Sequence, residues 1–183
     1  MFRKVEQARL RTSEAGLSPE GDGWYVLNVA EAQSGISPNF GGRVSLAGFR
    51  EEDSPEQELA VNIRLLQPGQ PNAYYHRENV DEAFLVLKGE CLAIVEDQEV
   101  RLRKGDFLWA PCGTGHIFVG TGERPCAILM MSRRIPEDDE VIEYPVSEVA
   151  ARHGASVSRA TTSVEEAYAG TGKRVPKSLG GLF

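Results

Sequence analysis

The middle of the chain contains two spaced motifs: GQPNAYYHRENVDEAFLVLKG at residues 69–89 and GDFLWAPCGTGH at residues 105–116. In each, glycines and a turn or bend frame a short apolar stretch that lies close to histidine or acidic residues. Histidine nitrogens and carboxylate oxygens are ligands suited to divalent transition metals. The candidate ligands in the two motifs are His76, Glu78, Glu82 and His116.

The spacing of the motifs suits a small barrel. The seven steps from Glu82 to Gly89 span about 23 Å at about 3.3 Å per residue in an extended strand. Gly89 can then adopt the positive φ that turns the chain into the next strand. In the second motif, the rigid bend at residues 111–113 directs His116 back toward the first motif.

Short segments of alternating polarity flank and fill these motifs. Leu59, Val61, Ile63 and Leu65 alternate with more polar residues, which predicts a strand with one buried face. The other strands predicted for the core are Glu82–Lys88, Cys91–Glu96, Glu99–Lys104, Phe107–Ala110, His116–Val119 and Ala127–Met131. Asp97-Gln98 predicts a hairpin. Many short strands separated by Gly and Pro turns predict an all-β barrel or jelly roll.

The flanks differ from this core. Two more strands are predicted at Trp24–Val29 and Val44–Phe49, and two short helices at 147–154 and 163–170, each with a serine cap. The basic, Gly-rich segment 173–183 is predicted to be a mobile or partner-docked tail. We expect one domain with an N-terminal extension (1–57), a barrel core (58–133) and C-terminal helices with a tail (134–183).

In this order and spacing, the two motifs resemble the paired motifs of the cupin superfamily. Bacterial and archaeal single-domain cupins of unassigned function have a similar Tyr-His-Arg-Glu stretch. The resemblance implies a double-stranded β-helix whose polar motif residues converge to hold a metal. The chain departs from the pattern at three points. One extra residue precedes His76, Glu78 replaces the second histidine, and Gly120 replaces the final asparagine.

A second register of the first motif would place Tyr75 and Arg77 at the two histidine positions. Arginine stays protonated and cannot ligate a metal, so the register with His76 and Glu78 is chemically better. Glu78 shares the parity of His76 if that stretch is extended, although its polar run is also typical of an exposed loop. Two histidines with one or two carboxylates suit Fe(II) or Mn(II), and also Zn or Ni.

Apolar residues beside the ligands predict a pocket for a small organic molecule. Phe84 and Val86 share the face of Glu82, and Phe118 shares that of His116. Trp109 and Cys112 are also predicted to line the pocket. Cys112 is interpreted as a small buried hydrophobe, with a catalytic thiol as the alternative.

Composition excludes several classes of function. The 183 residues carry a net charge of −7, which argues against a nucleic-acid partner. The first residues show no secretory pattern, and the longest apolar run, Cys126–Met131, is too short for a membrane span. Three scattered cysteines suit a reducing compartment, so we expect a cytoplasmic protein.

The sequence therefore predicts a barrel that binds a divalent metal and a small organic molecule. A metal-dependent dioxygenase or isomerase is one hypothesis. A non-catalytic binding or sensor protein with weak or no metal is the other, and no residue is assigned to a catalytic step. The apolar N-terminal strands also predict a homodimer in which they pack on, or pair with, the barrel of the partner. The alternative is that these strands complete the sheet of their own chain.

Overall fold

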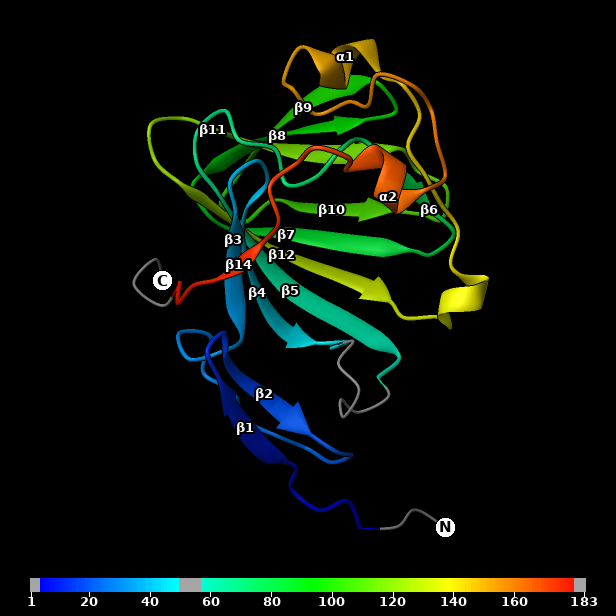
Figure 1. The fold of residues 1–183 in the computed structure, drawn as a ribbon. Coiled ribbons are helices and arrows are strands. Elements are labelled where there is room, and N and C mark those ends of the chain that lie inside the picture. Colours follow the sequence, from blue (N-terminus) through cyan, green and yellow to red (C-terminus); the bar gives the residue numbers. More distant parts are fainter. Residues whose placement is uncertain (1–3, 50–56, 180–183) are drawn as a thin grey trace.

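Two antiparallel sheets face each other in the computed structural model, which describes residues 4–49 and 57–179 (Figure 1). The larger sheet runs, in spatial order, β10 (Phe107–Ala110), β7 (Glu82–Lys88), β12 (Cys126–Arg133), β5 (Leu59–Leu66), β4 (Gly41–Ala47), β3 (Ser34–Ser37) and β14 (Val175–Pro176). The smaller sheet contains β11 (His116–Thr121), β8 (Glu90–Val95) and β9 (Gln98–Arg103). The predicted all-β barrel is confirmed, and each core strand lies within two residues of its predicted bounds.

The space between the two sheets is filled by one face of each strand. Phe84 and Val86 of β7 pack there against Ile128 of β12 and Phe118 of β11. All four side chains are buried. Burying each side chain of this size contributes about 1.5–3 kcal/mol, so this core holds the strands that carry the histidine and carboxylate motifs.

The N-terminal segment covers the outer face of the larger sheet. Leu27 and Val29 pack with Ala32 on a cluster that includes Val44 and Ile63. Before this segment, β1 (Arg9–Ser13) and β2 (Gly16–Glu20) form a hairpin that extends below the main sheet in Figure 1. These two strands and β3 were not predicted.

The predicted strand at Trp24–Val29 is wrong. This stretch is extended, but it has no ladder partner beyond an isolated bridge between Trp24 and Gln7. Its alternation has a different cause: Leu27 and Val29 pack on the sheet, whereas Trp24 and Val26 point to solvent. The strand predicted at 44–49 exists as β4, displaced toward the N-terminus to Gly41–Ala47.

The predicted hairpin after β8 is confirmed with a shift of one residue. Val95 pairs with Gln98, so Glu96 and Asp97 form the two-residue turn. Both have positive φ, 48° and 58°, as a type I′ turn requires. The turn fixes β9 against β8 and completes the smaller sheet.

The C-terminal part folds back over the barrel. β13 (Ile142–Glu143), which follows the 3-10 turn η1 (Glu137–Asp139), pairs with β6 (Arg77–Glu78). The helices α1 (Glu148–Ala151) and α2 (Val164–Ala167) are shorter than predicted, but both begin at the expected serine caps, Ser147 and Ser163. In the described residues, no helix is long and apolar enough to cross a membrane.

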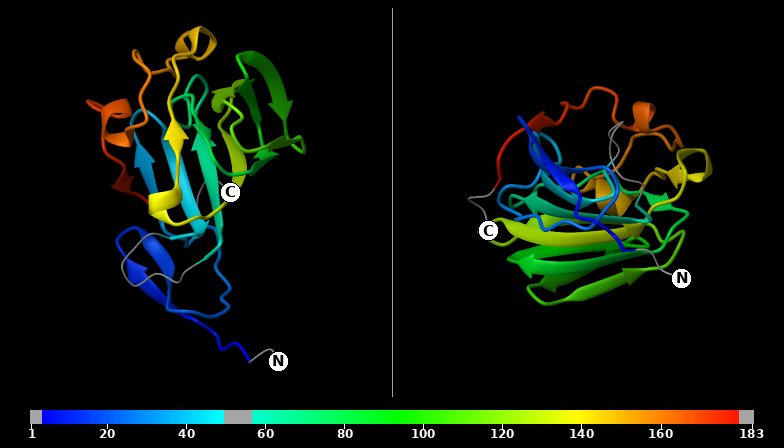
Figure 2. Two further views of the ribbon diagram at one scale, coloured as in Figure 1. Left: turned by 90° about the vertical axis from the view of Figure 1, so that its right-hand side faces the viewer. Right: turned by 90° about the horizontal axis from the view of Figure 1, so that it is seen from below.

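Part of the C-terminal tail docks on its own chain. β14 pairs with β3, and the N–H of Lys177 donates to the carbonyl of Ser34. Leu179 is buried with Val44 and Ile63, directly above Gly42. Figure 2 shows β14, drawn in red, at the edge of the larger sheet beside β3. Residues 180–183 of the predicted tail lie outside the described residues.

Candidate metal centre

Two histidines from different motifs lie directly opposite each other. The N–H of His116 donates to the carbonyl of His76 at 2.9 Å, and the reverse bond measures 3.3 Å. This antiparallel bridge places both side chains on the same face, so the ring centroids are 4.9 Å apart. The bend at residues 111–113 and the strand β11 after it bring His116 to this position, as the spacing predicted.

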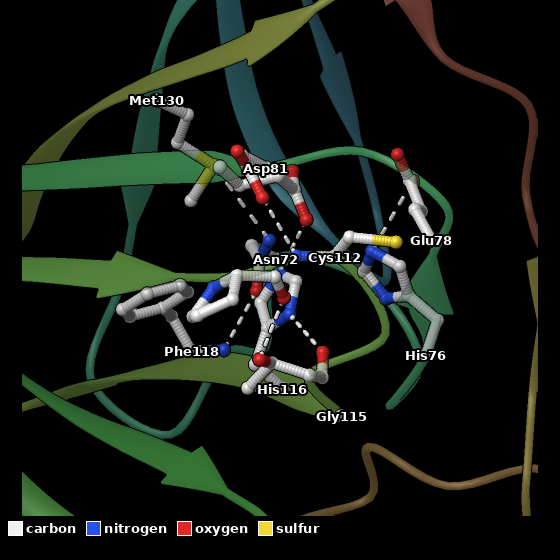
Figure 3. A network of polar contacts seen from close by, with 12 residues as sticks. Asn72, His76, Glu78, Asp81, Cys112, Gly115, His116, Phe118 and Met130 are labelled. Atoms are coloured by element: carbon white, nitrogen blue, oxygen red, sulfur yellow. Dashed lines mark hydrogen bonds and ion pairs between the residues drawn. The ribbon is translucent and has the colours of Figure 1, made fainter.

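Glu82 completes a group of three potential ligands. It begins β7 on the face that points between the sheets, and its Oε2 lies 3.2 Å from Nε2 of His116. One ligand atom from each of His76, Glu82 and His116 lies within 4.8 Å of the others. Figure 3 shows the two histidines in this network of polar contacts.

Backbone hydrogen bonds orient both imidazoles. Nδ1 of His76 lies 2.6 Å from the carbonyl of Tyr74, and Nδ1 of His116 lies 3.0 Å from the carbonyl of Thr114. A carbonyl only accepts, so each Nδ1 carries the proton and donates it. The lone pair therefore stays on Nε2, the atom that faces the carboxylates.

Burial also controls the charge of the site. Removal from water, followed by the effect of His116, lowers the pKa of His76 to about 3. Burial lowers the pKa of His116 as well. It raises the pKa of Glu82, and the negative charge of Glu78 raises it further. Both imidazoles are therefore neutral near pH 7, as metal ligation requires. Glu82, with its pKa raised to about 8, would release its proton when a cation binds.

Glu78 lies beside this group rather than within it. Its Oε1 is 3.6 Å from Nε2 of His76, and Figure 3 shows the carboxylate directed toward that ring. The pairing of β6 with β13 makes this segment an extended strand, not a loop. Asp81 faces outward and accepts a hydrogen bond from the N–H of Cys112.

The alternative register does not fit the structure. Tyr75 packs on the other side of the backbone, in a cluster with Ile94 and Ala150 beneath α1. Arg77 forms a surface ion pair with Glu143 at 2.8 Å. Neither side chain belongs to the group formed by His76, Glu82 and His116.

The predicted pocket residues divide into three groups. Phe84, Val86 and Phe118 lie in the buried core, and the ring of Phe84 is 5.0 Å from that of His116. The prediction that Trp109 lines the pocket is wrong. Trp109 pairs with Ala83 on the outer face and is 56% exposed, because Ala110 is the residue that shares the face of Glu82. Cys112 is exposed on the bend rather than buried.

Sequence reasoning missed an aromatic group beside the centre. The ring of Tyr144 lies 5.9 Å from that of His76 and contacts Tyr168, which in turn contacts Tyr74. Tyr144 and Tyr168 come from the C-terminal part of the chain, and no motif there indicates that it folds onto the barrel.

Comparison with known proteins identifies the class of barrel. Residues 62–132 match the family model described as cupin domain. Together with the two facing sheets and the paired motifs, this match shows that residues 62–132 form a cupin domain. No functionally curated protein matches the chain.

Several solved structures share this fold. A sugar phosphate isomerase of the cupin superfamily from Silicibacter pomeroyi is 25% identical, with a TM-score of 0.53 over 64% of this chain and 80% of that chain. The polyketide cyclase RemF from Streptomyces resistomycificus is 15% identical, with a TM-score of 0.51 over 63% of this chain and 89% of that chain. A cupin 2 conserved barrel domain protein from Rhodopseudomonas palustris is 16% identical, with a TM-score of 0.45 over 54% of this chain and 66% of that chain.

Proposed function

We propose that this cupin domain binds a divalent transition metal through His76, Glu82 and His116, with Glu78 as a fourth ligand. We further propose that the metal centre acts on a small organic molecule. The observation that supports this function best is the convergence of the three side chains, whose ligand atoms lie within 4.8 Å of one another.

The side chains fit such an ion. Two neutral imidazoles with free Nε2 lone pairs and one or two carboxylates form a mixed nitrogen and oxygen set, which suits Fe(II), Mn(II), Zn or Ni. The carbonyls that hold each Nδ1 are the kind of outer partner that orients metal-binding histidines. When bound, the metal would act as a Lewis acid toward an oxygen of the small molecule or as a binding site for dioxygen.

The surroundings favour chemistry on a small molecule with an oxygen-bearing group. Phe84 and Phe118 pack beside His116 and limit the access of water. Tyr144, in contact with His76 and Tyr168, provides a hydroxyl near the centre. The similarity to the Silicibacter pomeroyi sugar phosphate isomerase favours isomerisation over dioxygenation, as an analogy at the level of the fold.

A non-catalytic binding or sensor cupin is the second candidate. The position of Glu78 favours it, since this residue lies outside the group of mutually close ligand atoms. Three ligands instead of four would hold the metal more weakly. The two candidates therefore differ first in metal affinity.

Metal analysis of protein purified without an affinity tag tests the proposal. We expect about one divalent metal ion per chain in the wild-type protein. His116→Ala should lose it, because the variant removes the ligand that contacts Glu82. His153→Ala is the matched control, since His153 pairs with Glu99 on the surface next to α1. Equal metal content in the wild-type protein and His116→Ala would contradict the assignment.

A further inference from the structure

A half-buried arginine on the inner face of β5, Arg64, has no described counter-ion. Arg64 lies in the same row of the sheet as Ile128 of β12 and Arg43 of β4. The Nε and Nη1 atoms of Arg64 are buried and have no hydrogen-bond partner. Within residues 4–49 and 57–179, no carboxylate forms a salt bridge with Arg64. Burying part of a cation without a partner costs free energy of folding, so a negatively charged ligand would stabilise this position.

Two further arginines add positive charge to the same place. Arg43 is the cross-strand neighbour of Arg64, and Arg174 lies just before β14, where its side chain covers Gly35 of β3. Burial, then the charges of Arg43 and Arg174, lower the pKa of Arg64 well below its usual range. Arg43 is half-buried and Arg174 is exposed, so the positive charge extends from the inner face of β5 toward solvent beside β14.

A cavity opens beside two of these side chains, Arg43 and Arg174, and Arg64 adjoins it as the cross-strand neighbour of Arg43. It has a volume of about 390 Å³, and Arg43 and Arg174 line it together with Gln33, Ser34 and Ser45. This volume lies within the range of sites for small molecules. Arginine guanidinium groups and the hydroxyl of Ser45 are donors suited to the oxygens of a phosphate or a carboxylate, whereas the hydroxyl of Ser34 already donates to the carbonyl of Lys177.

We propose that Arg64, Arg43 and Arg174 form an oxyanion site that binds the phosphate or carboxylate group of a small molecule. The net charge of the whole chain is −7, so this positive cluster is a local exception on an acidic protein. That contrast favours a small anion over a polyanion such as nucleic acid, which would be repelled by the rest of the surface.

The oxyanion site and the candidate metal centre share the inner face of the larger sheet. Arg64 of β5 pairs with Ile128 of β12, and Ile128 lies in the same core cluster as Phe84. The ring of Phe84 is 5.0 Å from that of His116. We therefore assign the bound anion to the same small molecule that the metal centre would act on, and this assignment alone rests on the proposed function.

Titration with inorganic phosphate and with acetate, followed by calorimetry, tests the site. We expect the wild-type protein to bind one of these anions, and the one preferred identifies the group as phosphate or carboxylate. Arg64→Met keeps the length of the side chain without its charge and should weaken binding at least tenfold. Lys173→Gln is the matched control, because Lys173 is an exposed cation next to Arg174 and should leave binding unchanged.

Two measurements distinguish anion binding at Arg64 from a purely structural role of this residue and from anion binding at the metal centre. Without added anion, Arg64→Met should be as stable as the wild-type protein or more stable, because it removes an uncompensated buried charge. His116→Ala should keep its anion binding even though it loses metal, so failure of one site does not imply failure of the other. Absence of binding of both anions by the wild-type protein, or equal binding by Arg64→Met, would overturn the oxyanion site.

Discussion

At the scale of single residues, the candidate metal centre is prepared by backbone contacts rather than by other side chains. Each histidine donates from Nδ1 to the carbonyl two residues before it, Tyr74 for His76 and Thr114 for His116. The same backbone segments also bond to each other through the bridge between the two histidines. Ring orientation therefore depends on local chain geometry, which the surrounding strands fix.

The role of Glu78 can be measured separately from the role of the other ligands. We predict that Glu78→Gln lowers the affinity for the metal at least tenfold, within the 10- to 100-fold range for groups that support a metal site. Tyr75→Phe should not change the affinity, because Tyr75 packs on the opposite side of the backbone. Metal titration by calorimetry checks both variants. If Tyr75→Phe lost affinity and Glu78→Gln kept it, Glu78 would not be a ligand.

Individual residues also show how far the sequence could predict the site. His76, Glu82 and His116 were identifiable because motif spacing places them, and strand parity correctly separates Phe84 from its outward-facing neighbours. The same alternation places the side chain of Trp109 on the outer face of the sheet, so the prediction that Trp109 lines the pocket is wrong. Arg64 could not be recognised, since a polar residue in an alternating strand usually faces solvent. Arg64 instead lies on the inner face of β5, in a row with Ile128 and Arg43.

At the scale of elements, the N-terminal half shows why alternation alone is insufficient. Trp24–Val29 has the pattern of a strand, but its alternation reflects packing on a sheet rather than membership of one. In contrast, β3 contains Ser34, Gly35 and Ser37, which have little β-propensity, yet it forms ladders with β4 and β14. Tertiary pairing overrides the local preference there.

The docking of the C-terminal segment has a measurable energetic consequence. Leu179 is 4% exposed and fills the space above Gly42. We predict that Leu179→Ala lowers the free energy of unfolding by about 2–3 kcal/mol, the lower part of the range for buried Leu to Ala, because a terminal segment can relax. Val175→Ala, at an exposed position of β14, should cost about 0.5 kcal/mol or less. Chemical denaturation measures both. Equal effects would show that the segment does not dock in solution.

At the scale of the whole molecule, the free end of the larger sheet leaves apolar surface uncovered. Phe107 and Trp109 on the edge strand β10 are 58% and 56% exposed, and Leu59 is 50% exposed. A cavity of about 510 Å³ lies between Trp109, Leu59, Ala83 and Met131. The β1–β2 hairpin and the segment after it expose Leu10, Trp24 and Val26 as well. Apolar patches of this kind often mark an interface.

The homodimer remains a prediction, and these surfaces indicate how it would form. We predict that the exposed side chains Leu10, Trp24 and Val26 pack on the partner, while Leu27 and Val29 stay on the sheet of their own chain. The interface should exceed about 1,000 Å² in total. Light scattering should give about twice the chain mass of 20.1 kDa at micromolar concentration. Trp109→Asp should shift the protein toward the monomer by burying an unpaired charge. A wild-type mass near that of one chain would refute the dimer.

The pairing of β3 with β14 affects the order in which the protein becomes complete during synthesis. The hydroxyl of Ser34 donates to the carbonyl of Lys177, a residue 143 positions later. At the usual rate of translation, about 5–20 residues per second, β3 is synthesised roughly 7–30 s before β14. Through that interval its outer backbone groups are an open edge on which a second nascent chain can pair. Slower synthesis should therefore lengthen the period in which this edge is open to a second chain.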